Sequence, residues 1–466
     1  MIDLALAAQA IFWLVLFGCF LASGRASLFH PGTIYLAFHG LVFVARPILV
    51  YVFGFDASWN YMLFQPTNEA FVRTLAVSSA GLFCFLAASL ATGWGEMEFQ
   101  TKQPPSFTAL ERRALLATTL VLLPFVAYSI YATRNGIEGE RVGGIYILTN
   151  STGYLNEAQH FAMPLICLWM VATRFHWGNL VPVSAYVGYR IWFGWSRWTI
   201  LLFLLMAVLC YCWYYRKKWV SFGWIVAAVP ALVVFNLLGH NRDLLKQALG
   251  GDVIQVVDAR PGTTTAEKLR KQLDTQDYSN FDYLSYIVSI VPDRTGAFTY
   301  GSQYLQLFTE PIPRLLWKSK PVGAPVRTIN IGAYGNFVGL TVSLCGDGWM
   351  SGSWLGLVVT LSIAGALAGS AYRWFLKNQN EKTAALAYLA ALALSPQWFR
   401  DGGISIFKFL LFTLAPIACW VFLAWLLGAR RLFAYSVAIP GGTTVCFAEI
   451  NKNAGEALLN PSNEPS

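Results

Sequence analysis

Charged residues are scarce in this chain of 466 residues, where they make up 12% of the sequence against 56% for hydrophobic residues. So apolar a composition excludes an ordinary soluble domain and predicts a membrane protein. A bilayer core needs roughly 20 mostly apolar residues per helix, and this rule gives about eleven candidate spans. We therefore expect an all-α protein, a polytopic transmembrane helix bundle. Its spans are predicted to begin near Leu4, Thr33, Phe71, Ala114, Gln159, Leu180, Trp198, Val220, Trp354, Thr383 and Ser405.

Acidic residues are missing from the predicted spans. Proton- and sodium-coupled carriers usually need intramembrane carboxylates to bind and release the ion, so this absence argues against that class. Metal-ligand pairs are missing as well, because the five histidines are dispersed and no His-x-x-x-His or Cys-x-x-Cys pair occurs. The sequence also has no Gly-rich phosphate loop of the Walker type, so we expect neither a metal nor another cofactor.

The basic residues of the short loops fall in every second loop. Lysine and arginine are enriched on the cytoplasmic side of membrane proteins, so this alternation predicts an external N-terminus and a cytoplasmic C-terminus. We expect an N-terminal transmembrane bundle (1–238), a large external and partly helical loop (239–352), C-terminal transmembrane helices (353–431) and a cytoplasmic tail (432–466). The loops that carry the bias contain Arg25, Lys102, Arg112, Arg113, Arg174, Arg216, Lys217, Lys218, Arg373, Lys377, Lys382, Arg430 and Arg431.

Several arginines run against this charge bias. Arg46 lies within the second predicted span, where a charge is by default a functional hypothesis because its burial costs several kcal/mol or more. Others sit at the external ends of spans, where they either contact lipid headgroups or belong to a site outside the membrane. These are Arg73, Arg134, Arg141, Arg190, Arg197 and Arg400.

The external loop adds a basic stretch of its own. Between Arg294 and Arg327 the basic residues outnumber the single acid, Glu310. Arginine presents a planar fork of donors that matches phosphate oxygens, and an external anion site above a membrane bundle suits a lipid-linked phosphate or pyrophosphate. Nonspecific binding of anionic headgroups is the alternative interpretation. Trp317, in the same stretch, is either an interfacial belt residue or a face on which a sugar stacks.

A series of short motifs in the external loop is more specific. It resembles the bacterial Wzy-type polymerases of O-antigen or oligosaccharide repeat units. GWSR (194–197) looks like a Gly-Ser-Arg feature of that family with one residue inserted, and Asp347 in GDGW (346–349) stands where the family commonly has a glutamate. The other motifs are FDYL (281–284), YG (300–301), YL (304–305), PIPRLLW (311–317) and KP (320–321).

The resemblance implies a metal-independent glycosyltransferase of the GT-C type in the bacterial inner membrane. Such an enzyme works at the periplasmic face and moves a growing glycan from undecaprenyl pyrophosphate to the non-reducing end of a new lipid-linked repeat unit. The implied partners are the undecaprenyl-pyrophosphate-linked oligosaccharide, membrane lipid and a chain-length regulator protein, with no nucleic acid.

The implied reaction needs cations for the pyrophosphate and a base for the acceptor hydroxyl. Asp282 is the leading base because it lies in the FDYL motif, although an ion pair or a helix cap would also explain it. Arg314 and Arg197 are the leading catalytic cations. Further candidate bases are His240, Asp293 and Asp347, and the candidate pyrophosphate ligands are Arg141, Arg190, Arg197, Arg294, Arg314 and Lys320.

Two other function classes stay open at this point. An O-antigen ligase or a related membrane glycosyltransferase would use the same pyrophosphate chemistry and require a histidine in the large loop, where His240 is available. A non-enzymatic flippase of lipid-linked oligosaccharides would line its lumen with charges on both sides of the membrane. The missing intramembrane acids and the single large external loop argue against the flippase.

Overall fold

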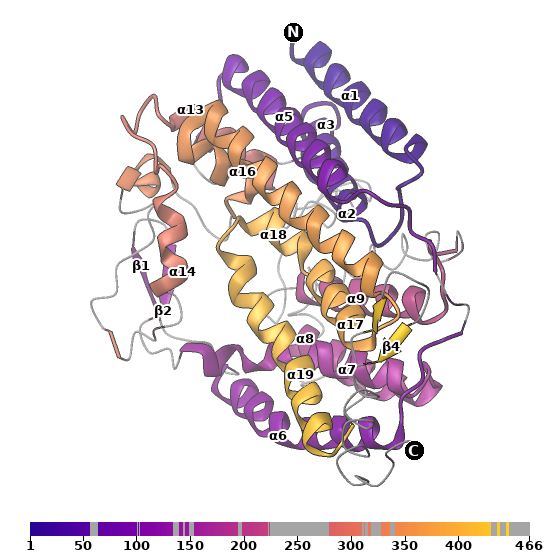
Figure 1. The fold of residues 1–466 in the computed structure, drawn as a ribbon. Coiled ribbons are helices and arrows are strands. Elements are labelled where there is room, and N and C mark those ends of the chain that lie inside the picture. The colour runs from indigo at the N-terminus through magenta and orange to yellow at the C-terminus, as the bar shows by residue number, and fades with distance from the viewer. Residues whose placement is uncertain are drawn as a thin grey trace, which may run out of the picture.

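The structure is a computed structural model in which helices dominate (Figure 1). It describes residues 1–55, 64–99, 101, 103–133, 139–142, 145–148, 153–193, 198–221, 223, 279–309, 312, 316–317, 328–335, 341–429, 436–438 and 444–446.

The first half of the described chain holds helices that follow the predicted apolar stretches. One of the elements, η1, is a π-helical turn that joins α2 to α3 in a continuous run. The elements are α1 (Ile2–Ala22), α2 (Pro31–His39), η1 (Gly40–Ala45), α3 (Arg46–Tyr51), α5 (Asn68–Thr92), α6 (Ala109–Thr133), η2 (Gly153–Phe161), α7 (Ala162–Ala172), η3 (Trp177–Asn179), α8 (Leu180–Phe193) and α9 (Trp198–Tyr214).

The second half begins with short elements and ends with long helices. The strands of the described residues form two short antiparallel hairpins, in which β1 pairs with β2 and β3 pairs with β4. The elements are α13 (Asn280–Ile290), η5 (Ser302–Leu305), α14 (Gln306–Thr309), η6 (Ile331–Tyr334), α16 (Ser343–Asn378), α17 (Lys382–Ala393), α18 (Ser395–Asp401) and α19 (Ser405–Leu426), with strands β1 (Gly139–Val142), β2 (Ile145–Leu148), β3 (Ser436–Ala438) and β4 (Thr444–Cys446).

Six of the described helical segments are long and apolar enough to cross a membrane. The predicted fold class is therefore confirmed: the protein is a membrane-embedded, multi-pass helix bundle. The predicted count of about eleven spans is not confirmed by the part of the chain that the structure describes. Helices α7, α8, α9 and α17 start near predicted spans but have 11, 14, 17 and 12 residues. Most of the span predicted from Val220 lies outside the described residues.

Helix α16 is interrupted where the chain leaves the loop that is predicted to be external. Gly352 and Ser353 have non-helical backbone angles, so α16 consists of a short segment followed by a long one that starts at Trp354. The long segment runs beside α5, as the orange and purple ribbons of Figure 1 show. This pair of helices forms the frame of the bundle.

The close approach of α5 and α16 depends on two glycines spaced four residues apart. A Cβ atom on Gly365 would lie 2.3 Å from the carbonyl oxygen of Phe85, and one on Gly369 would lie 2.4 Å from the carbonyl oxygen of Ser89. Small residues at this spacing let membrane helices pack backbone against backbone. The sequence between them, GALAG (365–369), is such a small-residue motif.

Several basic loops meet at one end of the bundle, which we call the basic end. Arg25 donates to the carbonyl of Leu90 at 3.1 Å, and Lys218 donates to the carbonyl of Gly24 at 3.3 Å. Arg216 donates to the carbonyl of Gln103 at 3.2 Å. Loops that alternate in the sequence therefore lie together in the fold.

The first turn of α6 shows how the sequence builds this end. Thr108 and Glu111 form a capping box, in which the Thr108 N–H donates to the Glu111 carboxylate at 2.7 Å and the Glu111 N–H donates to the Thr108 hydroxyl at 3.2 Å. The ammonium of Lys382 binds the same carboxylate at 2.7 Å. The start of α17 is thereby fixed to the start of α6.

Replacing Gly365 with alanine should destabilise the bundle. The added methyl group would overlap the Phe85 carbonyl, and overpacking of this kind typically costs about 1–3 kcal/mol. Gly18→Ala in α1 is the control, because a Cβ there meets nothing within 4 Å and alanine is the better helix former. Thermal unfolding of both variants in the same detergent should show a lower midpoint for Gly365→Ala alone. Equal midpoints would contradict the close packing of α5 and α16.

Candidate functional site

A group of buried charged and polar side chains lies at the end of the bundle opposite the basic end. The runs α2–η1–α3 and α17–α18 start near the basic end and reach this group at their far ends. Helix α13 and the short segment of α16 contribute from the loop that is predicted to be external. We call this group the polar cluster; it consists of Arg46, Asn280, Asp282, Asp347, Arg400 and Asp401.

The most deeply buried members are an ion pair. The guanidinium of Arg46 donates to Asp282 at 3.2 Å, and both side chains are at least 95% buried. Asp282 lies in the first turn of α13, where the helix dipole stabilises a negative charge. Its neighbour Phe281 packs edge-on against Phe71 of α5, which anchors α13 on the bundle. The apolar motif that surrounds Asp282 therefore buries it next to an arginine.

Asn280 ties three segments of the cluster together. Its side-chain amide donates to the carbonyl and hydroxyl of Thr341, at 3.0 and 2.8 Å, and to the carbonyl of Arg400 at 2.9 Å. One side chain thus connects the start of α13, the chain that leads into α16 and the end of α18.

Asp347 holds the turn between α18 and α19. The backbone N–H of Gly403 donates to its carboxylate at 2.6 Å. Gly402 adopts φ +89°, and a Cβ there would lie 2.4 Å from the same carboxylate oxygen. The Gly402–Gly403 pair is therefore required both for the backbone conformation and for the space around the carboxylate.

Arg400 completes the cluster from the last turn of α18. Its guanidinium lies 5.1 Å from the ring centroid of Trp198, a cation–π contact, and 3.8 Å from the Asp401 carboxylate. Asp401 also accepts a hydrogen bond from Gln397, one turn earlier. Among the residues that the structure describes, the buried Nε of Arg400 has no hydrogen-bond partner.

A second polar group joins η2 to α8 and α19. Lys408 donates to Glu157 at 2.5 Å, and His160 lies 3.2 Å from the same carboxylate. Arg190 donates to the side chain of Gln159 at 2.9 Å and is 7% exposed. This candidate pyrophosphate ligand therefore lies against η2, where Gln159 accepts its hydrogen bond.

The predicted site residues are thus distributed over several places. Asp282 and Asp347 are both in the polar cluster. Asp293 is exposed and pairs with Arg73 at 3.6 Å, while Arg294 is exposed and accepts a hydrogen bond from Tyr334 on its carbonyl. Trp317 is partly buried, and for Arg141 only the backbone, in β1, is described. Arg197, His240, Arg314 and Lys320 lie outside the described residues.

Sequence reasoning missed part of the cluster. Arg46 and Arg400 stood out as charges in unexpected places, but no site was assigned to them. Asn280 and Asp401 were not singled out at all. A signal was present, because Asn280 directly precedes the FDYL motif and Asp401 directly follows Arg400.

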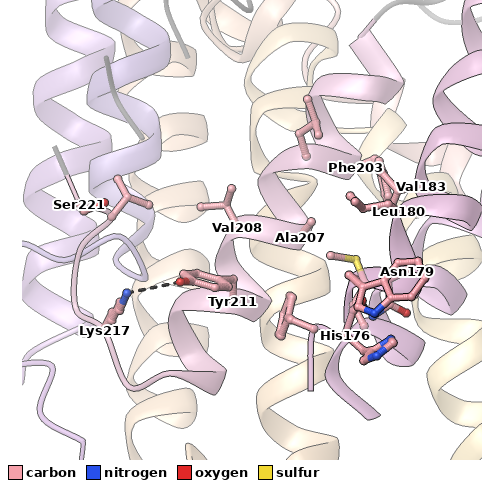
Figure 2. A pocket seen from close by; sticks show the side chains of 15 residues that line it. His176, Asn179, Leu180, Val183, Phe203, Ala207, Val208, Tyr211, Lys217 and Ser221 are labelled. Atoms are coloured by element: carbon pink, nitrogen blue, oxygen red, sulfur yellow. Dashed lines mark hydrogen bonds between the residues drawn. The ribbon is translucent and has the colours of Figure 1, made fainter. Parts of the chain in front are cut away.

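A cavity of about 420 Å³ lies elsewhere, near the basic end. Figure 2 shows its side chains, which are mostly apolar and come from the segment between α7 and α9 with its flanking helices, and from the chain that follows α9. The ammonium of Lys217 donates to the Tyr211 hydroxyl. The residues that line it include no carboxylate. Acid–base chemistry is therefore better served by the polar cluster, which combines arginines with three aspartates.

Comparisons of the chain with protein-family models, with curated proteins and with solved structures found no match. The argument for a function therefore depends on the residues of the cluster.

Breaking the Arg46–Asp282 pair should destabilise the protein. Asp282→Asn removes the buried negative charge that faces Arg46, and removal of one partner of a buried ion pair costs about 3–5 kcal/mol. Arg46→Met should cost a similar amount, and the double variant should lose less than the two single variants together. The thermal midpoint in detergent measures each loss.

The exposed ion pair of Arg73 and Asp293, at the same end of the bundle, is the control for this comparison of single and double variants. Asp293→Asn removes a carboxylate that faces Arg73, and exposed pairs contribute no more than about 1 kcal/mol. Strictly additive losses in the double variant would show that Arg46 and Asp282 do not depend on each other.

Proposed function

We propose that this protein is a metal-independent membrane glycosyltransferase that polymerises lipid-linked oligosaccharide repeat units. In this reaction the growing glycan moves from undecaprenyl pyrophosphate to the non-reducing end of a new lipid-linked repeat unit. The observation that carries the proposal is that the Arg46–Asp282 pair, Asp347 and Arg400 lie at the end of the bundle away from the basic loops, on segments that Asn280 and Gly403 connect. The motif series of the external loop supports the same reading.

The charge bias gives the proposed orientation. If the basic end faces the cytoplasm of a bacterial cell, the polar cluster faces the periplasm. The protein would then lie in the inner membrane with a periplasmic N-terminus and a cytoplasmic C-terminus. Lipid-linked repeat units present their sugars on that periplasmic side, where a chain-length regulator protein could also bind.

The leaving group of the reaction sets the demand on the cations. A pyrophosphate diester gains negative charge as the glycosidic bond breaks, so preorganised arginines stabilise the transition state more than the ground state. Arg400 suits this task because its buried Nε–H has no partner among the described residues. Buried donors without partners call for an explanation, and an anionic substrate group supplies one. Arg197, Arg314, Arg141 and Lys320 remain predicted contributors.

The acceptor hydroxyl must lose a proton during the transfer, and a carboxylate can accept it. Asp282 faces the guanidinium of Arg46, whereas Asp347 is bound by the neutral N–H of Gly403. We therefore assign the proton acceptor to Asp347 and a structural role to Asp282. In this assignment the bond from the sugar to the pyrophosphate breaks, the bond from the sugar to the acceptor oxygen forms, and the proton moves to Asp347.

The function can be tested with purified protein and undecaprenyl-pyrophosphate repeat units, without nucleotide sugar or added metal. We expect a ladder of longer lipid-linked glycans on a gel, because the donor already carries its leaving group. The control reaction adds lipid A core as a second acceptor. Transfer only to lipid A core would favour a ligase, and the absence of any transfer with intact substrate would refute the glycosyltransferase.

Replacing Arg400 with alanine should lower the yield of the ladder about 10- to 100-fold, because hydrogen bonds to charged groups contribute about 1.5–3 kcal/mol. Arg400→Lys should restore little of it if the guanidinium binds two phosphate oxygens at once. Arg373→Ala is the matched control, since Arg373, near the end of α16, makes the same kind of contact, 4.1 Å from the ring centroid of Trp94. Equal losses in Arg400→Ala and Arg373→Ala would remove the support for a phosphate site.

A further inference from the structure

Residues 301–309 form a short element between α16 and α19, which we call the wedge. The chain turns into it at Gly301, whose φ of +74° favours glycine. It contains the helical turns η5 and α14, seen beside the upper part of α19 in Figure 1. The side chain of Tyr304 lies against both neighbours. A Cβ on Gly403, two residues before α19, would lie 2.5 Å from the Tyr304 ring, and the Tyr304 hydroxyl lies next to the Thr360 side chain of α16.

The contact with Thr360 fixes the depth of the wedge. Thr360 follows Trp354, the first residue of the long segment of α16, by six residues, which at 1.5 Å per residue is about 9 Å along the helix. Trp354 is exposed, and exposed tryptophans favour the membrane interface. The Tyr304 hydroxyl therefore reaches below the level at which α16 enters the apolar part of the bilayer.

The backbone of the wedge suits such a position. The N–H of Ser302 donates to the carbonyl of Thr299 at 2.9 Å, and the N–H of Tyr304 donates to the carbonyl of Gly301 at 3.0 Å. The side chain of Gln303 is buried and donates to the Ser351 hydroxyl at 2.7 Å. Non-helical chain at membrane depth is tolerated where its polar groups are satisfied by protein, and these bonds satisfy the N–H groups of Ser302 and Tyr304 and the amide N–H of Gln303.

The opposite side of the wedge is apolar and exposed. Phe308 is 80% exposed and Leu305 is 65% exposed. On either side of the wedge stand helices with equally apolar exposed residues near their starts, Leu355 on α16 and Phe407 on α19. The exposed face of the wedge therefore continues the apolar surface that these two spans present to lipid.

We propose that the wedge is inserted into the bilayer, with Leu305 and Phe308 in contact with the acyl chains of membrane lipids. The inserted wedge fills the space between α16 and α19 next to the turn that Asp347 holds. This inference concerns a lipid-binding surface and does not depend on the proposed enzymatic activity.

Photo-crosslinking in vesicles tests the insertion. The full-length chain with Phe308→p-benzoylphenylalanine is placed in vesicles of phosphatidylethanolamine and phosphatidylglycerol with radiolabelled acyl chains, illuminated, and assayed for label on the protein band. We expect a label comparable to that of Leu355→p-benzoylphenylalanine and several-fold above that of Asp293→p-benzoylphenylalanine. Asp293 is the matched control because it is exposed in the loop after α13.

Leu305→p-benzoylphenylalanine gives a second, independent readout in case the Phe308 variant does not fold, and it should be labelled to the same extent. Label at the level of the Asp293 variant at both positions would overturn the proposal. Crosslinks from both positions to protein in place of lipid would overturn it as well, because the face would then be a protein contact.

Discussion

An arginine and an aspartate buried together in an apolar bundle constrain everything that packs around them. Neither Arg46 nor Asp282 would be stable at its depth without opposite charge nearby, because an isolated buried charge costs several kcal/mol. The pair therefore fixes α13 against the run α2–η1–α3. Asn280, two residues before Asp282, then fixes the end of α18, and with it the guanidinium of Arg400. One ion pair thus determines where the remaining charges of the cluster can lie.

The frame that supports the cluster is built from small residues. Gly365 and Gly369 let α16 approach α5 closely, and the break at Gly352 and Ser353 separates the first segment of α16 from the long one. Asp347 stands on that first segment. Its carboxylate can reach the N–H of Gly403 only because Gly402 carries no side chain, since a Cβ there would lie 2.4 Å from that carboxylate. Glycine is therefore required both where α16 packs on α5 and where Asp347 contacts the turn before α19, because a side chain would not fit at either place.

The sequence predicts the bundle well because apolar runs and bilayer thickness constrain each other directly. Most predicted spans start within a few residues of the first residue of a helix. The small-residue motif at Gly365 and Gly369 is visible in the sequence as well. The partners of the buried charges could not be predicted. Arg46 and Asp282 are 236 residues apart in the chain, and only the packing of α13 on α5 brings them together. Arg190 shows the same limit, because it lies against Gln159 in a different polar group.

The two arginines of the cluster differ in how firmly the protein holds them, which bears on their roles. Arg46 lies 3.2 Å from a fully buried carboxylate, so a substrate phosphate would have to compete with Asp282 for it. Arg400 lies 3.8 Å from a partly exposed carboxylate and is held chiefly by the face of Trp198. A cation–π contact positions a guanidinium without occupying the N–H donors at its edge. An incoming anion would therefore meet fewer competitors at Arg400, which makes Arg46 the residue that shapes the cluster and Arg400 the residue that is available to bind.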